Sequence, residues 1–103
     1  MRQVMVRYKV KPEQAARNEE LVRQVYEEIH KTAPAGLHYA TFVQEDGVSF
    51  VHVASSVETA DGRSPLLDVA AFRAFQEGIA DRCDEPPAPV GVREIGSYGF
   101  WGA

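Results

Sequence analysis

Two segments rich in β-branched and aromatic residues, 37–45 and 48–55, flank Asp46 and Gly47, and this pair of segments constrains the fold most. Asp-Gly in this setting is typical of a two-residue hairpin turn in which both central residues have positive φ. Such a turn fixes the register of the two strands. The pairs expected on one face are Glu45/Val48, Val43/Phe50, Thr41/His52 and Tyr39/Ala54, and those on the other are Phe42/Val51, Ala40/Val53 and His38/Ser55.

Both faces of this hairpin are apolar. A sheet with one face in water alternates apolar and polar residues along each strand, and these segments do not. We therefore expect something to cover each face. One face carries Tyr39, Val43, Val48 and Phe50, and the other carries Ala40, Phe42, Val51 and Val53.

The segments before the hairpin predict a strand followed by a helix. Residues 2–10 alternate with the period of a strand, and Pro12 suits the first turn of a helix that ends before Pro34. Glu19 and Arg23 are spaced as an ion pair on the exposed flank of that helix. Its apolar stripe contains Leu21, Val22, Val25 and Ile29.

The segments after the hairpin predict a second helix and a last strand. Residues 57–63 form a polar loop, and Ser64-Pro65 predicts a helix cap followed by a first-turn proline. Three prolines within 84–89 are expected to stop this helix, and a strand from Val90 to about Phe100 follows. The buried stripe of the helix contains Val69, Phe72, Phe75, Ile79 and Cys83.

The order strand, helix, strand, strand, helix, strand places both helices on one face of the sheet, because two crossovers of the same hand lie on the same side. A second copy of the chain, related by a two-fold axis, would cover the other face. The alternative is a monomer with an exposed apolar patch. The aromatic C-terminal run 98–103 is expected to dock either on its own domain or on the partner.

Length and charge narrow the class of protein. A chain of 103 residues without a long linker is expected to form one domain, 1–103. Its net charge is −4 and its basic residues are scattered, so we expect no nucleic-acid partner. The lone Cys83 fits a reducing compartment, and no secretion signal or membrane span is apparent, which predicts a cytoplasmic protein.

The element order, the first helix from Asn18 to Ile29 and the sequence Ala71-Phe72-Arg73-Ala74-Phe75 resemble the dimeric α/β-barrel superfamily, and more narrowly its antibiotic-biosynthesis-monooxygenase-like branch. The resemblance implies an α+β, ferredoxin-like βαββαβ fold. In that fold a four-stranded antiparallel sheet carries two helices on one face, and the other face pairs with a second copy to form a homodimer.

The superfamily includes cofactor-independent quinone-forming monooxygenases, haem-degrading enzymes, isomerases, decarboxylases and proteins without known activity. Its haem-degrading members use an Asn on the first strand with a Trp and a His. The first strand here lacks Asn, and the only tryptophan is Trp101, which argues against that branch.

His52 is the first candidate for chemistry, because the register places it mid-strand on an otherwise apolar face, beside Thr41 and near Tyr39. An imidazole there could act as a base or a hydrogen-bond donor, with Tyr39 as the second catalytic candidate. The alternative is a structural histidine that bonds to a neighbouring side chain or to its mate in the dimer. His38 falls on the opposite face and His30 on a helix, so we expect neither a metal site nor a cofactor.

Asn18, Tyr8 and Thr41 are the candidate ligand-binding residues. Asn18 lies on the apolar stripe of the first helix and could line a pocket between helix and sheet, or it could lie at the edge of the stripe and meet water. Tyr8 could stack on a planar ligand, although strand aromatics also serve packing alone.

These residues suggest a cofactor-free, monooxygenase-like enzyme for a small planar aromatic or quinone-type substrate. The alternative is a non-catalytic small-molecule-binding or accessory dimer whose barrel interior is packed solid. A third reading, a dimerisation module, has no supporting residue. A pocket of a few hundred Å³ beside His52 would argue against a packed interior.

Overall fold

The computed structural model describes residues 2–57 and 64–100. Its four strands form one antiparallel sheet in the order β2-β3-β1-β4, which confirms the expected α+β, ferredoxin-like fold. The elements in chain order are β1 (Arg2–Val10), the 3-10 turn η1 (Pro12–Gln14), α1 (Ala15–Thr32), β2 (Leu37–Val43), β3 (Ser49–Ser56), the 3-10 turn η2 (Pro65–Asp68), α2 (Ala70–Gln76), α3 (Ile79–Arg82) and β4 (Cys83–Gly91).

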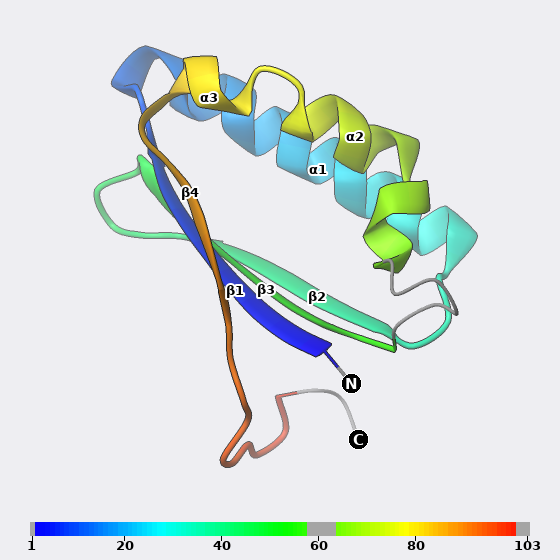
Figure 1. Ribbon diagram of the computed structural model, residues 1–103. Helices are drawn as coiled ribbons and strands as arrows, with labels where there is room; N and C mark the ends of the chain where they lie inside the picture. The colour runs from blue at the N-terminus through cyan, green and yellow to red at the C-terminus, as the bar shows by residue number, and fades with distance from the viewer. Residues whose placement is uncertain (1, 58–63, 101–103) are drawn as a thin grey trace.

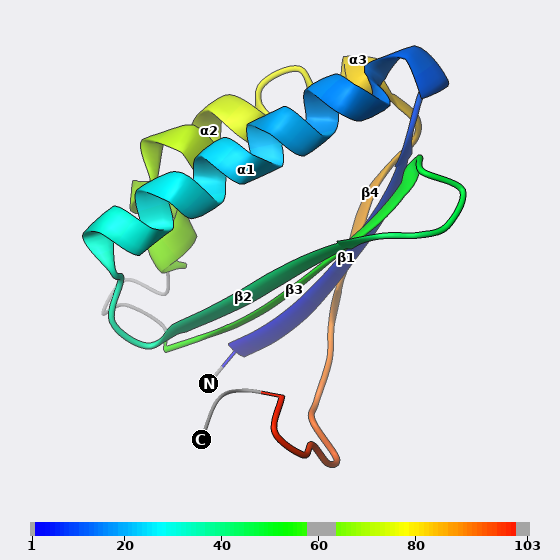
Figure 2. The ribbon, with the colours of Figure 1, turned by 180° about the vertical axis from the view of Figure 1, so that it is seen from behind.

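All the helices lie on one face of the sheet, as the two crossovers predicted (Figures 1 and 2). The described residues place no helix on the other face. Within the same residues, no helix is long and apolar enough to cross a membrane.

The hairpin has the expected register but not the expected turn. Tyr39 pairs with Ala54, Thr41 with His52 and Val43 with Phe50. The Gln44 amide donates to the Ser49 carbonyl, so the chain reverses through the four residues 45–48 between them, where Gly47 has a φ of 77° and Asp46 does not have positive φ. The Asp46 carboxylate instead accepts hydrogen bonds from the backbone of the following residues. The register survives because a four-residue loop and a two-residue turn share the same midpoint.

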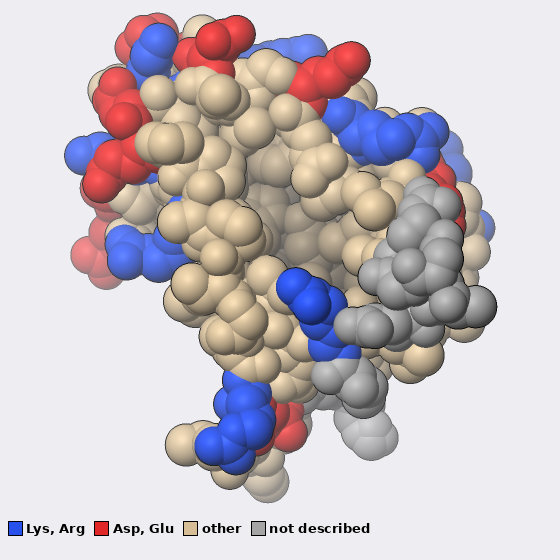
Figure 3. Space-filling view, in the orientation of Figure 1, with Lys and Arg blue, Asp and Glu red and all other residues tan. Residues whose placement is uncertain are grey.

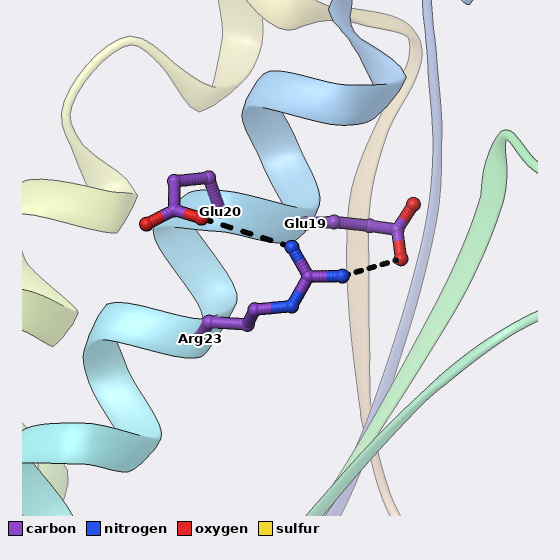
Figure 4. Close-up of polar contacts among 3 residues, drawn as sticks. All are labelled: Glu19, Glu20 and Arg23. Carbon is purple, nitrogen blue, oxygen red and sulfur yellow. Dashed lines mark ion pairs between the residues drawn. The ribbon is translucent and has the colours of Figure 1, made fainter.

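α1 follows the sequence closely. It begins after a 3-10 turn at Pro12 and ends at Thr32, where Ala33 adopts the left-handed conformation with a φ of 43°. Arg23 lies between Glu19 and Glu20 on the exposed face, with nitrogen-to-oxygen distances of 3.7 Å to each (Figure 4). Such exposed pairs contribute only about 0.3–0.5 kcal/mol each.

The second helix is not continuous, and this part of the prediction is wrong. Ser64 caps the chain as expected by accepting from the Leu66 amide, but the cap opens only the short turn η2. α2 begins later because the Glu28 carboxylate, on α1, accepts the first two amide groups of α2 at 2.9 and 3.0 Å. Gly78, with a φ of 72°, then separates α2 from α3.

The last strand also differs from the prediction. β4 runs from Cys83 to Gly91, so it contains the prolines that were expected to precede it, and it ends where the strand was expected to begin. β4 is an edge strand with two irregularities in its pairing to β1. Proline lacks an amide donor and is tolerated at such an edge, because no second strand requires that donor.

The core lies between the helices and the sheet. Tyr8 and Phe50 stack with a centroid distance of 5.4 Å, and Leu21 and Val25 of α1 close over them. The expected stripe of the second helix is largely correct, because Val69, Phe75 and Cys83 are buried and Phe72 and Ile79 are partly buried.

The face without helices carries apolar side chains around the exposed Arg7, and the chain beyond β4 contacts one part of it. Phe42 and Val90 are 48% and 49% exposed there, and Met5, Val51 and Val53 are partly exposed. Beyond β4 the chain turns back beneath the sheet (Figures 1 and 2), where the Glu94 amide donates to the Gln3 side chain and Phe100 lies beside Phe42. Of the two alternatives expected for the tail, docking on its own domain is therefore seen at Phe100, whereas Tyr98 is fully exposed. Residues 101–103 and most of the expected loop 57–63 lie outside the described residues.

Replacing Ala33 by glycine should stabilise the fold by roughly 0.5–1 kcal/mol, because glycine adopts positive φ without steric strain. The matched control, Ala16→Gly in the exposed part of α1, should destabilise it by about 1 kcal/mol. Urea unfolding of both variants checks the pair. Destabilisation by Ala33→Gly would contradict the conformation found at this position.

Candidate functional site

A cavity of about 500 Å³ lies between the sheet and the segment η2–α3. On the face of the molecule seen in Figure 3, a hollow lies below the helices, bordered mostly by uncharged side chains with one basic side chain at its lower edge. The volume falls within the range of about 300–1,000 Å³ that is usual for small-molecule sites. The lining residues are Arg2, Val4, Val6, Tyr8, Tyr39, His52, Ala54, Ser56, Ser64, Leu66, Leu67, Phe72, Phe75, Gln76, Ile79 and Pro87.

The wall of the cavity is mostly apolar and aromatic. Arg2 is the one lining residue that carries a charge among those the structure describes. Tyr8 of β1, Tyr39 of β2 and His52 of β3 are the wall residues that combine an aromatic ring with a hydrogen-bonding group. Such a wall suits a planar aromatic molecule that presents few polar atoms.

His52 forms hydrogen bonds through both ring nitrogens. Its Nε2 lies 2.7 Å from the Tyr8 hydroxyl, and its Nδ1 lies 2.5 Å from the Tyr39 hydroxyl and 3.2 Å from Thr41 Oγ1. The sheet register produces this cluster, because His52 pairs with Val6 on one side and with Thr41 on the other. His52 therefore bonds to neighbouring side chains on two strands, β1 and β2.

A chain of buried polar groups continues behind the cavity wall. Asn18 Nδ2 donates to the Tyr8 hydroxyl at 2.9 Å, and Arg82 Nε donates to Asn18 Oδ1 at 3.3 Å. Arg82 is only 8% exposed, and its other nitrogens donate to the backbone carbonyls of Phe75 and Glu77. We call the series Arg82, Asn18, Tyr8, His52 and Tyr39 the buried hydrogen-bond chain.

Burial sets the charge states of this chain. Desolvation lowers the pKa of His52 to about 4, so the imidazole is neutral near pH 7. Burial also raises the pKa of the Tyr8 and Tyr39 hydroxyls well above the usual range, and that of Tyr26 to about 12. The guanidinium of Arg82 is thus the charged member of the chain at neutral pH.

The candidate residues divide into two groups. Tyr8, Tyr39 and His52 line the cavity, whereas Asn18 and Thr41 lie behind it and bond to Tyr8 and His52. Asn18 is fully buried, so the alternative that it lies at the edge of the stripe and meets water is wrong.

The other two histidines lie apart from this cluster. His38 pairs with Ser55 on the opposite face of the sheet, and His30 is exposed on α1. Among the described residues, no three or more His, Cys, Asp or Glu side chains are grouped as metal ligands.

Two residues of the site were not identified from the sequence. Arg82 lies seven positions after Phe75, where it continues the buried stripe of the second helix, and this spacing was the available signal. Tyr26 stacks on Tyr39 at 5.3 Å and bonds to Thr41 Oγ1 at 2.8 Å. Its position four residues after Val22, at the edge of the apolar stripe, gave a weaker signal.

Comparison with known proteins gives matches in structure but none in sequence. No family model matches the chain, and no curated protein matches it in sequence. A protein of Nitrosomonas europaea, provisionally named an antibiotic biosynthesis monooxygenase, superposes with a TM-score of 0.74 at 18% identity, covering 92% of this chain and 99% of that one.

Two further structures agree. A Bacteroides thetaiotaomicron protein with the same provisional name gives a TM-score of 0.72 at 12% identity, over 91% of this chain and 89% of its own. A Mycobacterium tuberculosis protein gives a TM-score of 0.72 at 12% identity, and the match covers 93% of this chain and 96% of that one. The chain therefore shares the ferredoxin-like fold of these structures.

Acidification should weaken the fold through His52. The pKa of a histidine is about 6.5 in the unfolded chain, and that of His52 in the fold is about 4. The unfolded chain therefore takes up a proton first, so the stability that neutral His52 contributes is complete above pH 6.5 and is lost as the pH falls toward 4. The loss amounts to about 3 kcal/mol over that interval.

Urea unfolding between pH 7 and pH 4 measures this dependence. His52→Gln should flatten the pH dependence of the free energy of unfolding, although it also lowers stability at pH 7 because it breaks the hydrogen bonds. His30→Gln, at an exposed position on α1, should leave the pH dependence as it is. An unchanged pH dependence in His52→Gln would show that His52 is not the group responsible.

Proposed function

We propose that the chain forms a single domain that dimerises, binds a small planar aromatic molecule in the cavity and acts on it as a cofactor-independent, monooxygenase-like enzyme. The observation that carries this proposal is an apolar cavity with Tyr8, Tyr39 and His52 together on its wall. The provisional names of structures with the same fold support the class of reaction. A packed interior, the basis of the non-catalytic alternative, is not what the cavity suggests.

The chemistry that suits this site begins with a phenol-type ring. Ionisation of the phenol makes the ring electron-rich enough to pass electrons to O₂ and form a hydroperoxide at a ring carbon. Loss of water then yields the quinone, so that one naphthol and one O₂ give one naphthoquinone and one water. The substrate supplies the electrons in this scheme.

The protein's contribution would be binding and electrostatics. Hydroxyl groups held in an apolar wall stabilise charge on a substrate oxygen more strongly than water does. The aromatic side chains Phe72 and Phe75 would hold the ring, and the Tyr39 hydroxyl is placed to meet its oxygen. His52 would act through its tyrosine neighbours, because both of its nitrogens are bonded.

The dimer is proposed from the open face of the sheet. Phe42 and Val90, each about half exposed, lie with the apolar residues of β1 and β3 on the face without helices. An exposed group of apolar side chains usually marks a protein interface, and here the group surrounds Arg7 of β1. An identical sheet related by a two-fold axis would cover it.

Filling the cavity tests the ligand proposal. Ala54→Phe places a ring in the cavity and should weaken binding of 1-naphthol by at least about tenfold, a change of about 1.4 kcal/mol. Ala74→Phe adds the same ring at an exposed position on α2 outside the cavity and should leave binding unchanged.

Calorimetry measures the binding, and an oxygen electrode measures turnover to the quinone. Absence of naphthol binding by the native chain would rule out the proposed ligand class. Binding without oxygen consumption would favour the non-catalytic alternative.

Sedimentation tests the dimer. The native chain should sediment as a dimer, and Phe42→Lys should produce monomers because it places a charge on the paired sheet faces. Gln24→Lys, on the exposed side of α1, adds the same charge away from that face and should remain dimeric. A native chain that sediments only as a monomer would contradict the assembly.

A further inference from the structure

The buried hydrogen-bond chain has a fixed direction that begins at Arg82. A guanidinium group donates hydrogen bonds and accepts none. Arg82 Nε, 3.3 Å from the side-chain oxygen of Asn18, therefore identifies that atom as the acceptor. The amide nitrogen of Asn18 then points to the Tyr8 hydroxyl, 2.9 Å away, and donates to it.

The next step follows from the single proton of the Tyr8 hydroxyl. Its oxygen already accepts from Asn18, and the side chain is buried, so its own proton needs an acceptor. His52 Nε2, 2.7 Å away, is the acceptor that the contacts provide. If Nε2 carried a proton, the Tyr8 proton would be left buried without a partner in these contacts. Nε2 is therefore bare, and the neutral ring carries its proton on Nδ1.

The proton on His52 Nδ1 determines whether Tyr39 offers the cavity a hydrogen-bond donor or an acceptor. Nδ1–H donates to the Tyr39 hydroxyl at 2.5 Å and lies 3.2 Å from Thr41 Oγ1. Tyr39 therefore accepts from His52 and keeps its own proton for another acceptor. The Thr41 hydroxyl, which contacts the same His52 nitrogen, is the neighbouring side chain that can take this proton. Because Tyr39 lines the cavity, an oxygen of a bound ligand would compete for it.

We infer that Arg82 and Asn18 are positioning residues that hold His52 in the Nδ1–H tautomer, so that Tyr39 presents a hydrogen-bond donor to the ligand. Neither positioning residue is required to touch the ligand. Their effect passes through Tyr8 and His52, with every donor oriented from Arg82 toward the cavity.

The donor direction of the buried hydrogen-bond chain also indicates which chemical groups the ligand carries. This conclusion about the ligand rests on the proposed function. A planar aromatic ligand with a carbonyl or phenolate oxygen would accept the Tyr39 proton. A hydrocarbon of the same size could not. The site should therefore distinguish an oxygen acceptor from the bare ring, with the same donor stabilising negative charge on that oxygen.

The tautomer of His52 tests the inference without any ligand. Nitrogen-15 NMR of the native chain near pH 7 should show a protonated Nδ1 and a bare Nε2. The reverse pattern, or protons on both nitrogens, would overturn the inference. This measurement needs no variant, so it does not depend on whether any substitution disturbs folding.

Asn18→Asp should reverse the direction of the hydrogen bonds from Tyr8 to Tyr39 in the buried hydrogen-bond chain. A carboxylate accepts only, so it would take the bond from Arg82 and also the proton of the Tyr8 hydroxyl. Tyr8 would then accept from His52, whose proton would move to Nε2, and Tyr39 would donate to the bare Nδ1. The control Gln24→Glu introduces the same charge on the exposed side of α1 and should leave the tautomer unchanged. A folded Asn18→Asp variant that keeps Nδ1–H would contradict the mechanism.

Two probes test the consequence for binding. The native chain should bind 1,4-naphthoquinone roughly tenfold more tightly than naphthalene, the effect of one added hydrogen bond. Asn18→Asp should remove most of that difference and leave naphthalene binding unchanged. Equal binding of both probes by the native chain would refute the donor role of Tyr39. A native Nδ1–H tautomer with no binding of either probe would reject the proposed function and leave the direction of the chain intact.

Discussion

The hydrogen bond between the Tyr8 hydroxyl and His52 joins two neighbouring strands beneath the helices, and the interior is built around it. Both side chains are buried, so every polar atom they carry needs a partner. The Tyr8 bond requires Asn18 from α1, and the His52 bonds require Tyr39 and Thr41 from β2. One buried pair thereby links the sheet register to the position of the first helix.

Arg82 extends the same linkage to the second helical segment. Its guanidinium binds the carbonyls of Phe75 and Glu77 at the end of α2, which is the negative end of a helix. Its side chain can reach both α2 and Asn18 because the chain breaks at Gly78 before α3 begins. The break that ends α2 therefore places a cation behind the cavity, next to the neutral side chains of Asn18, Tyr8 and His52.

The sequence could predict those parts of the fold that depend on local spacing. The hairpin around Asp46 indicated that Thr41 and Tyr39 lie near His52, and the element order placed the helices on one face. The third partner of His52, Tyr8, comes from β1 and was not predicted. It could not predict the start of α2, because the Glu28 carboxylate that caps it comes from α1, 42 and 43 residues away. The prolines of β4 were misread because only the assembled sheet shows that this strand lies at an edge. Arg82 was missed for a similar reason, because the backbone carbonyl of Glu77 is available to accept its hydrogen bond only where α2 ends.

A crystal structure of the native chain with 1,4-naphthoquinone would test the central claim most directly. We expect the ring between the helices and the sheet, against Phe72 and Phe75, with one carbonyl oxygen within hydrogen-bond distance of the Tyr39 hydroxyl. A cavity that side chains fill in the crystal, or a quinone bound elsewhere without contact to Tyr39, would contradict the account.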